Sequence, residues 1–171
     1  MAVLEILTYP HLSLKRRAEE VEKVDGEIRK LISDMVDTMY ANGGIGLAAP
    51  QVGVPKRVVV LDVRPYDPST SLISIVNPEV VAEGEEVINE EGCLSVPGCV
   101  EGIKRRRWIK VRGLSERGRE IEVEGEGMLA IVLQHEIDHL NGRVILDRMS
   151  RVKRDLYKKR LQKGKGEGGM M

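Results

Sequence analysis

The residues best suited to chemistry stand together in one short segment, His135-Glu136-Ile137-Asp138-His139. In a helix, residues four apart lie on the same face, so both imidazoles can reach one metal ion. Glu136 then lies beside that ion, where its carboxylate can accept or deliver a proton. Two of the three histidines of the chain stand in this segment. The pattern therefore predicts a catalytic metal site on a helix.

A third protein ligand is expected, because a catalytic ion of this kind usually has three protein ligands and one open position for water. Zinc proteases with this pattern generally take the third ligand downstream. The only acids downstream are Asp147, Asp155 and Glu167. None is well placed to bind the ion, because Asp147 follows the helix end closely, Asp155 lies among basic residues and Glu167 is in the tail. Cys93 lies upstream, in the segment EGCLS, and offers a soft thiolate donor. We therefore expect Cys93 to join the two histidines.

Two other interpretations use the same residues. A zinc endopeptidase would need a third ligand other than Cys93, so removal of that thiol would leave its metal in place. A structural zinc site would use Cys93, Cys99, His135 and His139. Such sites usually place two to four residues between the cysteines, whereas five stand between them here. A closed structural site would also have no use for Glu136. Both alternatives are therefore less favoured than a catalytic site.

The elements that position these residues can be predicted from periodicity and turn residues. Apolar residues at helical spacing, an Asp25 N-cap and the stop Asn42-Gly43-Gly44 indicate a first helix. Helices are expected at 25–41, 128–140 and 148–163. Stretches rich in β-branched residues predict strands at 57–63, 72–76, 85–88, 108–111 and 120–124, with turns at Gly84, Gly113 and Gly118.

This order of elements indicates a single α+β domain rather than alternating βαβ units. We expect antiparallel strands packed around a central metal-binding helix, with one helix near each terminus. The catalytic domain should cover residues 1–163, and the glycine-rich tail at 164–171 should be disordered. The cleft should lie between the 44–51 loop and the 91–95 strand.

Composition narrows the function classes. The chain has 171 residues with 27 basic and 27 acidic side chains, so no overall field draws it to DNA or to a membrane. It contains no Phe, and its two cysteines are too few for a disulfide framework. Because no apolar run approaches the roughly 20 residues that a membrane span needs, we expect a cytoplasmic protein. Residues 79–91 are acidic and residues 148–163 are basic.

Three separate segments resemble one protein family. Residues 44–51 read GIGLAAPQ, residues 91–95 read EGCLS and residues 135–140 read HEIDHL. Peptide deformylases of the bacterial type carry a glycine-rich segment ending in Gln, an EGCxS segment and an HExxHL segment in this order. The resemblance covers about residues 1–163. The segment at 98–102 departs from the family pattern, which puts contacts to the downstream part of a peptide in doubt.

The resemblance implies removal of the formyl group from the N-terminal formyl-methionine of new polypeptides. Cys93, His135 and His139 would hold one divalent metal ion with water as the fourth ligand. In this family the native metal is typically Fe(II), although zinc, nickel or cobalt can occupy the site. Glu136 would take the proton of the water and deliver it to the leaving amine. The family also implies oxyanion contacts from the side-chain amide of Gln51 and the backbone N–H of Leu94.

Substrate contacts are implied in the same way. The main chain of Ile45, Gly46 and Gly92 would contact the peptide, and Glu91, also placed at the substrate site, would orient a metal ligand or pair with Arg105. An apolar pocket for the methionine side chain is expected from the metal helix, with Met128, Ile131 and Val132 as its candidates. The alternative for these three is ordinary core packing, and for Gln51 it is a bond to its own turn. The partners would be formyl-methionyl nascent peptides. Residues 104–107 and the basic C-terminal helix are candidates for a contact with the ribosome, where the substrate emerges, and the alternative is a solvated basic face.

Overall fold

The computed structural model describes residues 2–163, and the predicted tail at 164–171 lies outside this range. Five strands form one sheet in the order β1-β2-β3-β4-β5, with every neighbouring pair antiparallel. The elements are α1 (Gly26–Ala41), β1 (Gly46–Ala48), η2 (Ala49–Val52), β2 (Val58–Leu61), β3 (Ile73–Cys93), β4 (Val96–Leu114), β5 (Glu120–Glu126), α2 (Met128–Leu140), η3 (Ile145–Arg148) and α3 (Arg151–Gln162), preceded by η1 (Leu12–Lys15). The predicted α+β architecture is confirmed.

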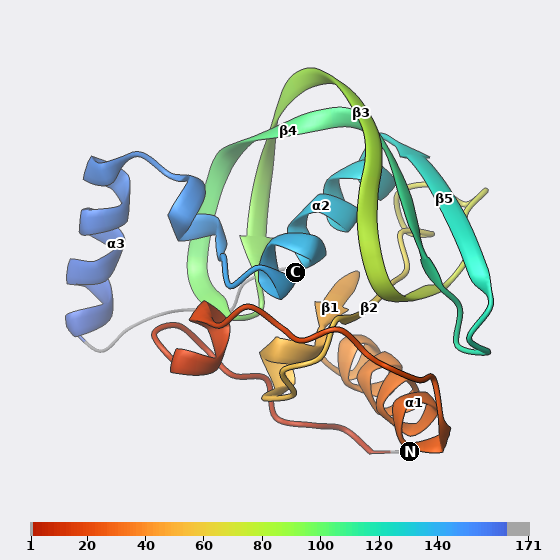
Figure 1. The fold of residues 1–171 in the computed structure, drawn as a ribbon. Helices are drawn as coiled ribbons and strands as arrows, with labels where there is room; N and C mark the ends of the chain where they lie inside the picture. The colour runs from red at the N-terminus through yellow and green to blue at the C-terminus, as the bar shows by residue number, and fades with distance from the viewer. Residues whose placement is uncertain (1, 164–171) are drawn as a thin grey trace.

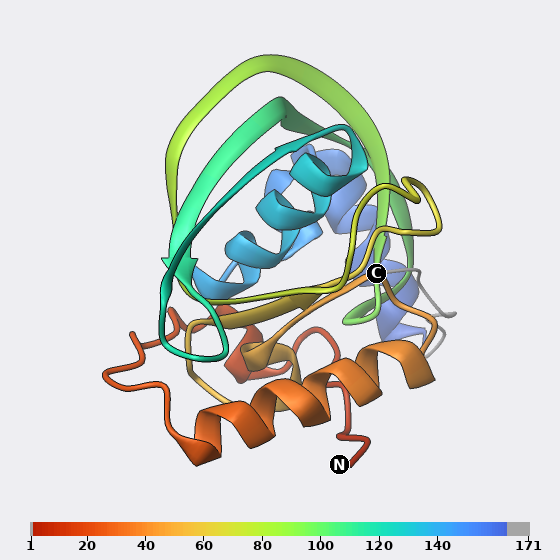
Figure 2. The same ribbon diagram turned by 90° about the vertical axis from the view of Figure 1, so that its right-hand side faces the viewer.

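The strongly curved strands β3 and β4 enclose helix α2. Figures 1 and 2 show these two strands and β5 bending around α2, while β1 and β2 separate it from α1. The register between β3 and β4 shifts at three places, one of them between Glu91 and Cys93. Such bulges bend a strand and increase its twist. The curvature therefore lets one sheet surround the helix that carries the HExxH segment.

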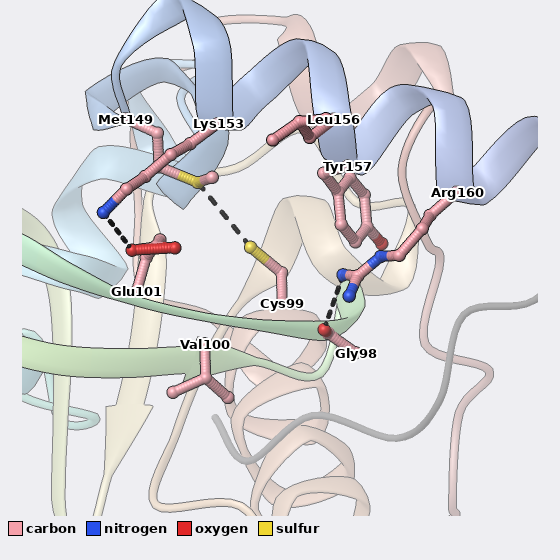
Figure 3. Close-up of a pocket in the computed structure, with 9 residues that line it drawn as sticks. All are labelled: Gly98, Cys99, Val100, Glu101, Met149, Lys153, Leu156, Tyr157 and Arg160. Carbon is pink, nitrogen blue, oxygen red and sulfur yellow. Dashed lines mark hydrogen bonds and ion pairs between the residues drawn. The ribbon is translucent and has the colours of Figure 1, made fainter.

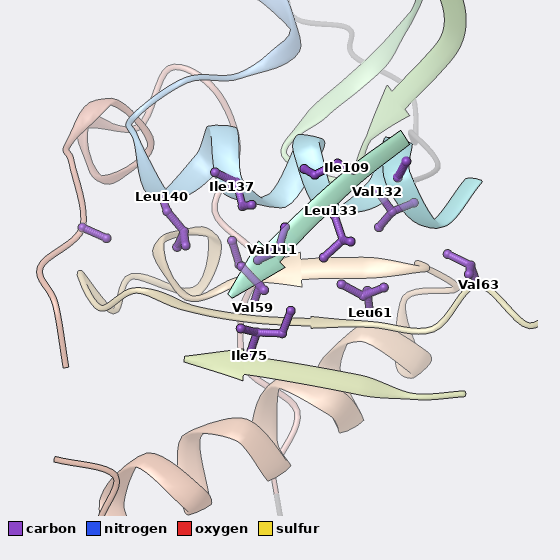
Figure 4. Close-up of a cluster of buried hydrophobic side chains, with 13 residues drawn as sticks. Val59, Leu61, Val63, Ile75, Ile109, Val111, Val132, Leu133, Ile137 and Leu140 are labelled. Atoms are coloured by element: carbon purple, nitrogen blue, oxygen red, sulfur yellow. The ribbon is translucent and has the colours of Figure 1, made fainter. Parts of the chain in front are cut away.

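Strand β2 separates two hydrophobic clusters. Alternate side chains of a strand point to opposite faces, and Val58 and Val60 pack toward α1 while Val59 and Leu61 pack toward α2. Figure 4 shows the cluster on the α2 side, where Val59 and Leu61 lie below Leu133 of the helix. The fully buried strand explains the continuous apolar run in the sequence. The two helices are thus fixed on opposite faces of the same sheet.

Strands β3, β4 and β5 are longer than the sequence predicted, whereas β2, predicted at 57–63, is shorter and covers Val58–Leu61. The expected turns at Gly84 and Gly113 are wrong, because both residues lie inside strands and only Gly118 stands in a turn. An added Cβ at Gly84 would meet Nε1 of Trp108 at 2.5 Å, so this glycine makes room for the indole. Strand β1 was not predicted, and the C-terminal helix begins three residues later than expected, after η3.

The uneven charge of the sequence reflects strand pairing. Acidic residues of β3 face basic residues of β4 across the ladder, with ion pairs Arg107–Glu85 at 2.9 Å, Arg106–Glu83 at 3.6 Å and Lys104–Glu86 at 4.0 Å. The second basic segment forms α3, which lies apart from α1 and β5 in Figure 1. Within residues 2–163, no helix is both long and apolar enough to cross a membrane.

Candidate metal centre

Helix α2 presents the HExxH segment inside the protein. Its predicted bounds agree with the structure, Met128–Leu140, and its second half is almost completely buried. The chain leaves the helix through Asn141 and Gly142, which has φ +75°. A Cβ at Gly142 would lie 2.5 Å from the carbonyl oxygen of Lys15, so the close approach of the N-terminal segment also requires glycine there. The end of α2 is therefore set by packing as well as by turn geometry.

Three donor atoms from two elements converge at the buried face of α2. Cys93 is the last residue of β3, and its Sγ lies 3.4 Å from Nε2 of His139. The two Nε2 atoms of His135 and His139 are 3.2 Å apart. All three donor atoms lie within 4.8 Å of one another, and none of the three residues is more than 2% exposed. Sequence reasoning had proposed this same set.

This donor set fits a divalent transition metal. With metal–nitrogen bonds near 2.0 Å and a metal–sulfur bond near 2.3 Å, tetrahedral angles place two nitrogens about 3.3 Å apart and a sulfur about 3.5 Å from each nitrogen. The observed 3.2 and 3.4 Å separations agree with that arrangement. One thiolate and two imidazoles are also the ligand types that such ions prefer. The geometry and the chemistry of the three side chains thus support one metal site.

Glu91 orients one of the two histidines. Nδ1 of His135 lies 3.0 Å from Oε1 of Glu91, so this ring nitrogen carries the proton and leaves Nε2 free as a ligand. Burial acts to lower the pKa of His135, but the neighbouring Cys93 and Glu91 raise it well above its usual value. Burial and the neighbouring His135 lower the pKa of His139 well below its usual value, which favours the neutral ligand form.

The same glutamate belongs to a largely buried ion network that joins β3, β4, α2 and η3. Arg105 donates from Nε and Nη2 to the two oxygens of Glu91, both at 2.7 Å, and from Nη1 to Asp138 at 2.7 Å. Arg148 donates to the other side of Asp138. Burial acts against the ionised carboxylates, yet these arginines lower the pKa values of both Glu91 and Asp138. The sequence suggested that Glu91 would either orient a metal ligand or pair with Arg105. In the structure it contacts both His135 and Arg105.

Glu136 lies in an environment unlike that of the other carboxylates. It is 0% exposed, and neither of its oxygens has a hydrogen-bond partner within residues 2–163. Burial raises the pKa of Glu136 to about 7. Strand β1 lies against it, since a Cβ on Gly46 would overlap its Oε2 and would meet Cγ1 of Val132 at 2.7 Å. An unpaired buried carboxylate of this kind is costly and marks a group available for proton transfer.

Gln51 points its amide group at the site from η2. Its Oε1 accepts from the N–H of Ala48 at 2.9 Å, so it does tie down its own turn. Its Nε2 donates to Oγ of Ser95 at 3.0 Å and lies 3.9 Å from Sγ of Cys93. Leu94 and Ser95 form the two-residue turn between β3 and β4. Sequence reasoning assigned no role to Ser95, although it stands in the EGCLS segment.

The remaining residues proposed for substrate binding lie around this centre. Ile131 and Val132 are buried and Met128 is half-buried, and Val132 and Met128 pack in the hydrophobic cluster between α2 and the sheet. Gly92 is buried in β3, and half-buried Ile45 precedes β1. A cavity of about 500 Å³ opens beside Ile45 and is lined by Tyr40, Gly43, Gly44, Ile45, Asp62, Arg64 and Pro65. An added Cβ on Gly44 would lie 2.9 Å from Cδ1 of Leu94, so the 44–51 and 91–95 segments face each other.

Cys99 lies away from the three donor atoms. Figure 3 shows it under α3 in a cavity of about 410 Å³, with its Sγ 3.6 Å from Sδ of Met149. Burial, followed by the Glu101 carboxylate, raises the pKa of this thiol and keeps it protonated. In the described part of the chain, the cluster of possible metal ligands contains Cys93 and not Cys99. This arrangement speaks against the structural Cys2His2 interpretation.

The endopeptidase interpretation also loses its candidate ligands. Asp147 accepts from the backbone N–H of Val144 at 2.8 Å within η3, and Asp155 is exposed on α3. Glu167 lies outside the described residues. Cys93 is therefore the third ligand that the geometry supports.

A family model described as polypeptide deformylase matches residues 3–155. The chain belongs to the peptide deformylase family. This deformylase is 48% identical to the peptide deformylase of Thermodesulfovibrio yellowstonii over 162 residues, which cover 95% of this chain and 98% of the relative. It is 50% identical to that of Desulfosudis oleivorans over 164 residues, 95% of each chain. The family resemblance seen in the three segments is confirmed.

Solved deformylase structures share the fold. The peptide deformylase of Ehrlichia chaffeensis in complex with actinonin matches this deformylase with a TM-score of 0.90 and 46% identity, covering 95% of this chain and 98% of the other. That of Legionella pneumophila matches with a TM-score of 0.87 and 44% identity, covering 96% and 99%. The likeness extends over the whole domain, including α2 and the strands that enclose it.

Proposed function

We propose that this deformylase holds one divalent metal ion on Cys93, His135 and His139 and that Glu136 moves the proton of the reaction. As a member of its family, the chain removes the N-formyl group from N-formyl-methionyl peptides and releases formate. The observation that carries the proposal is the convergence of three buried donor atoms within 4.8 Å next to a buried, unpartnered carboxylate.

The roles of the protein groups follow from this arrangement. A bound divalent ion would supply Lewis acidity, polarising the formyl oxygen and lowering the pKa of a water molecule. Glu136 accepts the proton of the attacking water and later gives it to the leaving amine. Because burial raises its pKa to about 7, the group is suited to both steps near neutral pH. The Glu91 carboxylate keeps His135 in the tautomer that leaves Nε2 available.

Oxyanion stabilisation is assigned to Gln51 and Leu94. One N–H of the Gln51 amide is donated to Ser95, and the other makes only a long contact, 3.9 Å from Nε2 to Sγ of Cys93, which it would exchange for the developing oxyanion. The backbone N–H of Leu94 is the second donor, from the turn that follows Cys93. Removal of one such donor typically lowers kcat by about a hundredfold or more.

The peptide would bind as an extended strand. Strand β1 lies at the edge of the sheet and pairs on one side with β2, so its outer edge can pair with an extended chain. Ile45, Gly46 and Gly92 would provide these main-chain contacts. Met128, Ile131 and Val132 would receive the methionine side chain, with Glu91 serving the site through His135 and Arg105. Substitution of Met128 by Ala should raise KM for formyl-methionyl peptides more than for formyl-alanyl peptides.

Formate release from formyl-Met-Ala-Ser tests the assignment, with acetyl-Met-Ala-Ser as the substrate control. Protein is purified without oxygen, and wild type is compared with Glu136→Gln at equal metal content. We expect release from the formyl peptide by wild type alone. A folded, metal-bound Glu136→Gln variant that retains wild-type activity would refute the role of Glu136. Loss of metal from Cys93→Ala completes the test, since a metal retained there would require another ligand.

Fe(II) is the proposed native metal because membership of the family implies it; the ligand set of one thiolate and two imidazoles accommodates iron as well as zinc, nickel or cobalt. An iron–thiolate site is open to oxidation by air. The iron form should therefore lose activity in air faster than the nickel and cobalt forms of the same preparation. Equal lifetimes of the three forms would argue against iron as the native metal.

The basic helix α3 is proposed as a contact with the ribosome in the cytoplasm. It carries seven basic residues and one acid over residues 151–163, whereas the basic residues of β4 are largely paired with glutamates. Contacts of this kind weaken as salt rises. Sedimentation of the full chain with ribosomes at 50 and 300 mM salt should show binding that falls with salt and is lost when Lys158, Lys159 and Arg160 are replaced by Gln. Salt-independent binding would contradict the proposal.

A further inference from the structure

The side-chain amide of Gln51 is held in one orientation by two partners. The Ala48 N–H donates to its Oε1 at 2.9 Å, which identifies the oxygen end of the amide. At the other end, Nε2 donates to Oγ of Ser95 at 3.0 Å. Both Gln51 and Ser95 are buried, at 1% and 0% exposure. With one N–H taken by Ser95, the second N–H lies on the side of Cys93, whose Sγ is 3.9 Å from Nε2.

The backbones of Gln51 and Ser95 are joined through a third segment. The N–H of Leu7 donates to the carbonyl of Gln51, and the N–H of Tyr9 donates to the carbonyl of Ser95, both at 2.7 Å. We call residues 7–9 the N-terminal strap. Together with the Ser95–Gln51 side-chain bond, the strap closes a ring of three hydrogen bonds among η2, the β3–β4 turn and the N-terminal segment. The ring fixes the distance between the segments that carry Gln51 and Leu94.

We propose that Ser95 is a positioning residue that directs the second N–H of Gln51, the one on the side of Cys93, toward the reacting carbonyl. The terminal torsion of a glutamine is broad, so one bond to Oε1 leaves the amide free to swing. The Ser95 hydroxyl removes that freedom from the opposite end. The inference rests on the proposed oxyanion role of Gln51, and it adds a residue that does not touch the substrate. Misplacement of a catalytic group by about 1 Å can cost a hundredfold in rate.

A double-mutant cycle tests the inference with the metal-loaded full chain. Ser95→Ala should lower kcat for formyl-Met-Ala-Ser by about ten- to a hundredfold, with KM and metal content nearly unchanged. In the Gln51→Ala background the same substitution should cause no further loss, because Ser95 acts only through Gln51. Independent, multiplying losses would overturn the positioning role. Ser95→Thr, which keeps the hydroxyl, should restore part of the rate.

Thr38→Val is the matched control. Thr38 is also fully buried, and its hydroxyl binds the N-terminal segment by accepting from the N–H of Leu4 at 2.8 Å. Loss of this hydroxyl in Thr38→Val should lower the free energy of unfolding as Ser95→Ala does, but it should leave kcat unchanged. A fall in kcat as large as that of Ser95→Ala would mean that general loosening, and not positioning, causes the effect.

A second readout does not depend on turnover. In the zinc-loaded protein, the side-chain amide signals of Gln51 are identified by their absence from the spectrum of Gln51→Ala. Their hydrogens should exchange with solvent faster in Ser95→Ala than in wild type or Thr38→Val. If Gln51→Ala itself leaves kcat unchanged, the oxyanion role falls and the inference with it. If Gln51→Ala is slow while Ser95→Ala has normal kcat and exchange, only the positioning role is refuted.

Discussion

Glu91 and Arg105 form a two-pronged ion pair across the β3–β4 ladder, with both N–O distances at 2.7 Å and side-chain exposures of 0% and 1%. Removing one member of a charge pair that is buried away from water strongly destabilises a protein, because it leaves an uncompensated buried charge. Here the guanidinium serves two carboxylates, those of Glu91 and Asp138, and Glu91 in turn holds His135. The stability of the sheet and the orientation of a metal ligand therefore depend on the same arginine.

Replacing Arg105 by Met should destabilise the protein strongly. The substitution keeps most of the side-chain volume but leaves Glu91 without its cation inside the protein. Removal of one partner of a buried pair costs about 3–5 kcal/mol. Urea denaturation of the metal-free protein at pH 7 measures this loss directly.

Arg107→Met provides the comparison. Arg107 stands two positions along β4 and pairs with Glu85 at 2.9 Å, but the two side chains are 59% and 61% exposed. Exposed pairs contribute at most about 1 kcal/mol. Equal losses in the free energy of unfolding for Arg105→Met and Arg107→Met would show that burial does not increase the contribution of the Glu91–Arg105 pair to stability.

Glu136 should make the metal-free protein less stable as the pH rises. Burial raises its pKa from the usual value of 4.5 to about 7. Between these values the unfolded chain ionises the carboxyl group while the folded chain keeps it protonated, so stability present below pH 4.5 is lost as the pH rises through 7. The shift corresponds to about 3 kcal/mol.

Glu136→Gln isolates this effect, because its neutral amide has nearly the same shape and does not titrate. The free energy of unfolding of wild type, relative to the variant, should fall from pH 4.5 to pH 7 and then level off. Above pH 7 the inactive variant should be the more stable protein. A difference that stays flat across this range would mean that the carboxyl group ionises freely in the folded state.

Gly46→Ala should damage catalysis through Glu136. The new methyl group would overlap Oε2 of Glu136 and press on Val132, so either β1 or the carboxylate must move. We expect a loss in kcat/KM of about a hundredfold. Gly26→Ala is the control, because its nearest neighbour would be the Arg29 side chain at 3.9 Å. Normal activity of Gly46→Ala would mean that β1 can shift without disturbing Glu136.

Tyr40→Phe should weaken substrate binding more than it slows the chemical step. The Tyr40 hydroxyl donates to Asp62, and the N–H of Asp62 donates to the carbonyl of Ile45 at 2.9 Å. These contacts tie the end of α1 to the segment proposed to pair with the peptide. A rise in KM with kcat nearly constant is expected in steady-state assays. Tyr66→Phe, on an exposed loop, should change neither constant.

Local patterns were sufficient to predict the metal helix. Periodicity and the Asn141-Gly142 stop predicted α2 at its observed bounds, and the HExxH spacing predicted that His135 and His139 lie together on one face. Asp25 caps α1 as expected, by accepting from the N–H of Ile28. Strand β1 escaped prediction because Gly46 has low strand propensity. The sequence analysis divided β3 at Gly84 because glycine usually indicates a turn. The real reason for this glycine is the Trp108 indole packed against it, and that residue is 24 positions away in the sequence.

The contacts around the metal ligands were harder to predict, because they join residues far apart in sequence. Asp138 lies inside the HExxH segment, yet nothing local shows that it pairs with Arg105, 33 residues earlier. One signal was available. The acidic stretch at 79–91 is followed by the basic stretch at 104–107, and opposite charges on successive strands favour an antiparallel pair. Matching the acidic stretch to the basic stretch would have predicted that β3 and β4 form one long hairpin.

The tight fit behind Gly46 has a consequence for how this family varies. Glycine there is required by Glu136 and Val132 at the back of the strand, whatever peptide lies in front of it. A library of variants at this strand position, screened only for folded protein, should therefore be depleted of side chains larger than that of alanine even though no turnover was demanded. Preservation of this residue among descendants would then report on the architecture of the domain, and a descendant that had lost its enzymatic activity would still carry it.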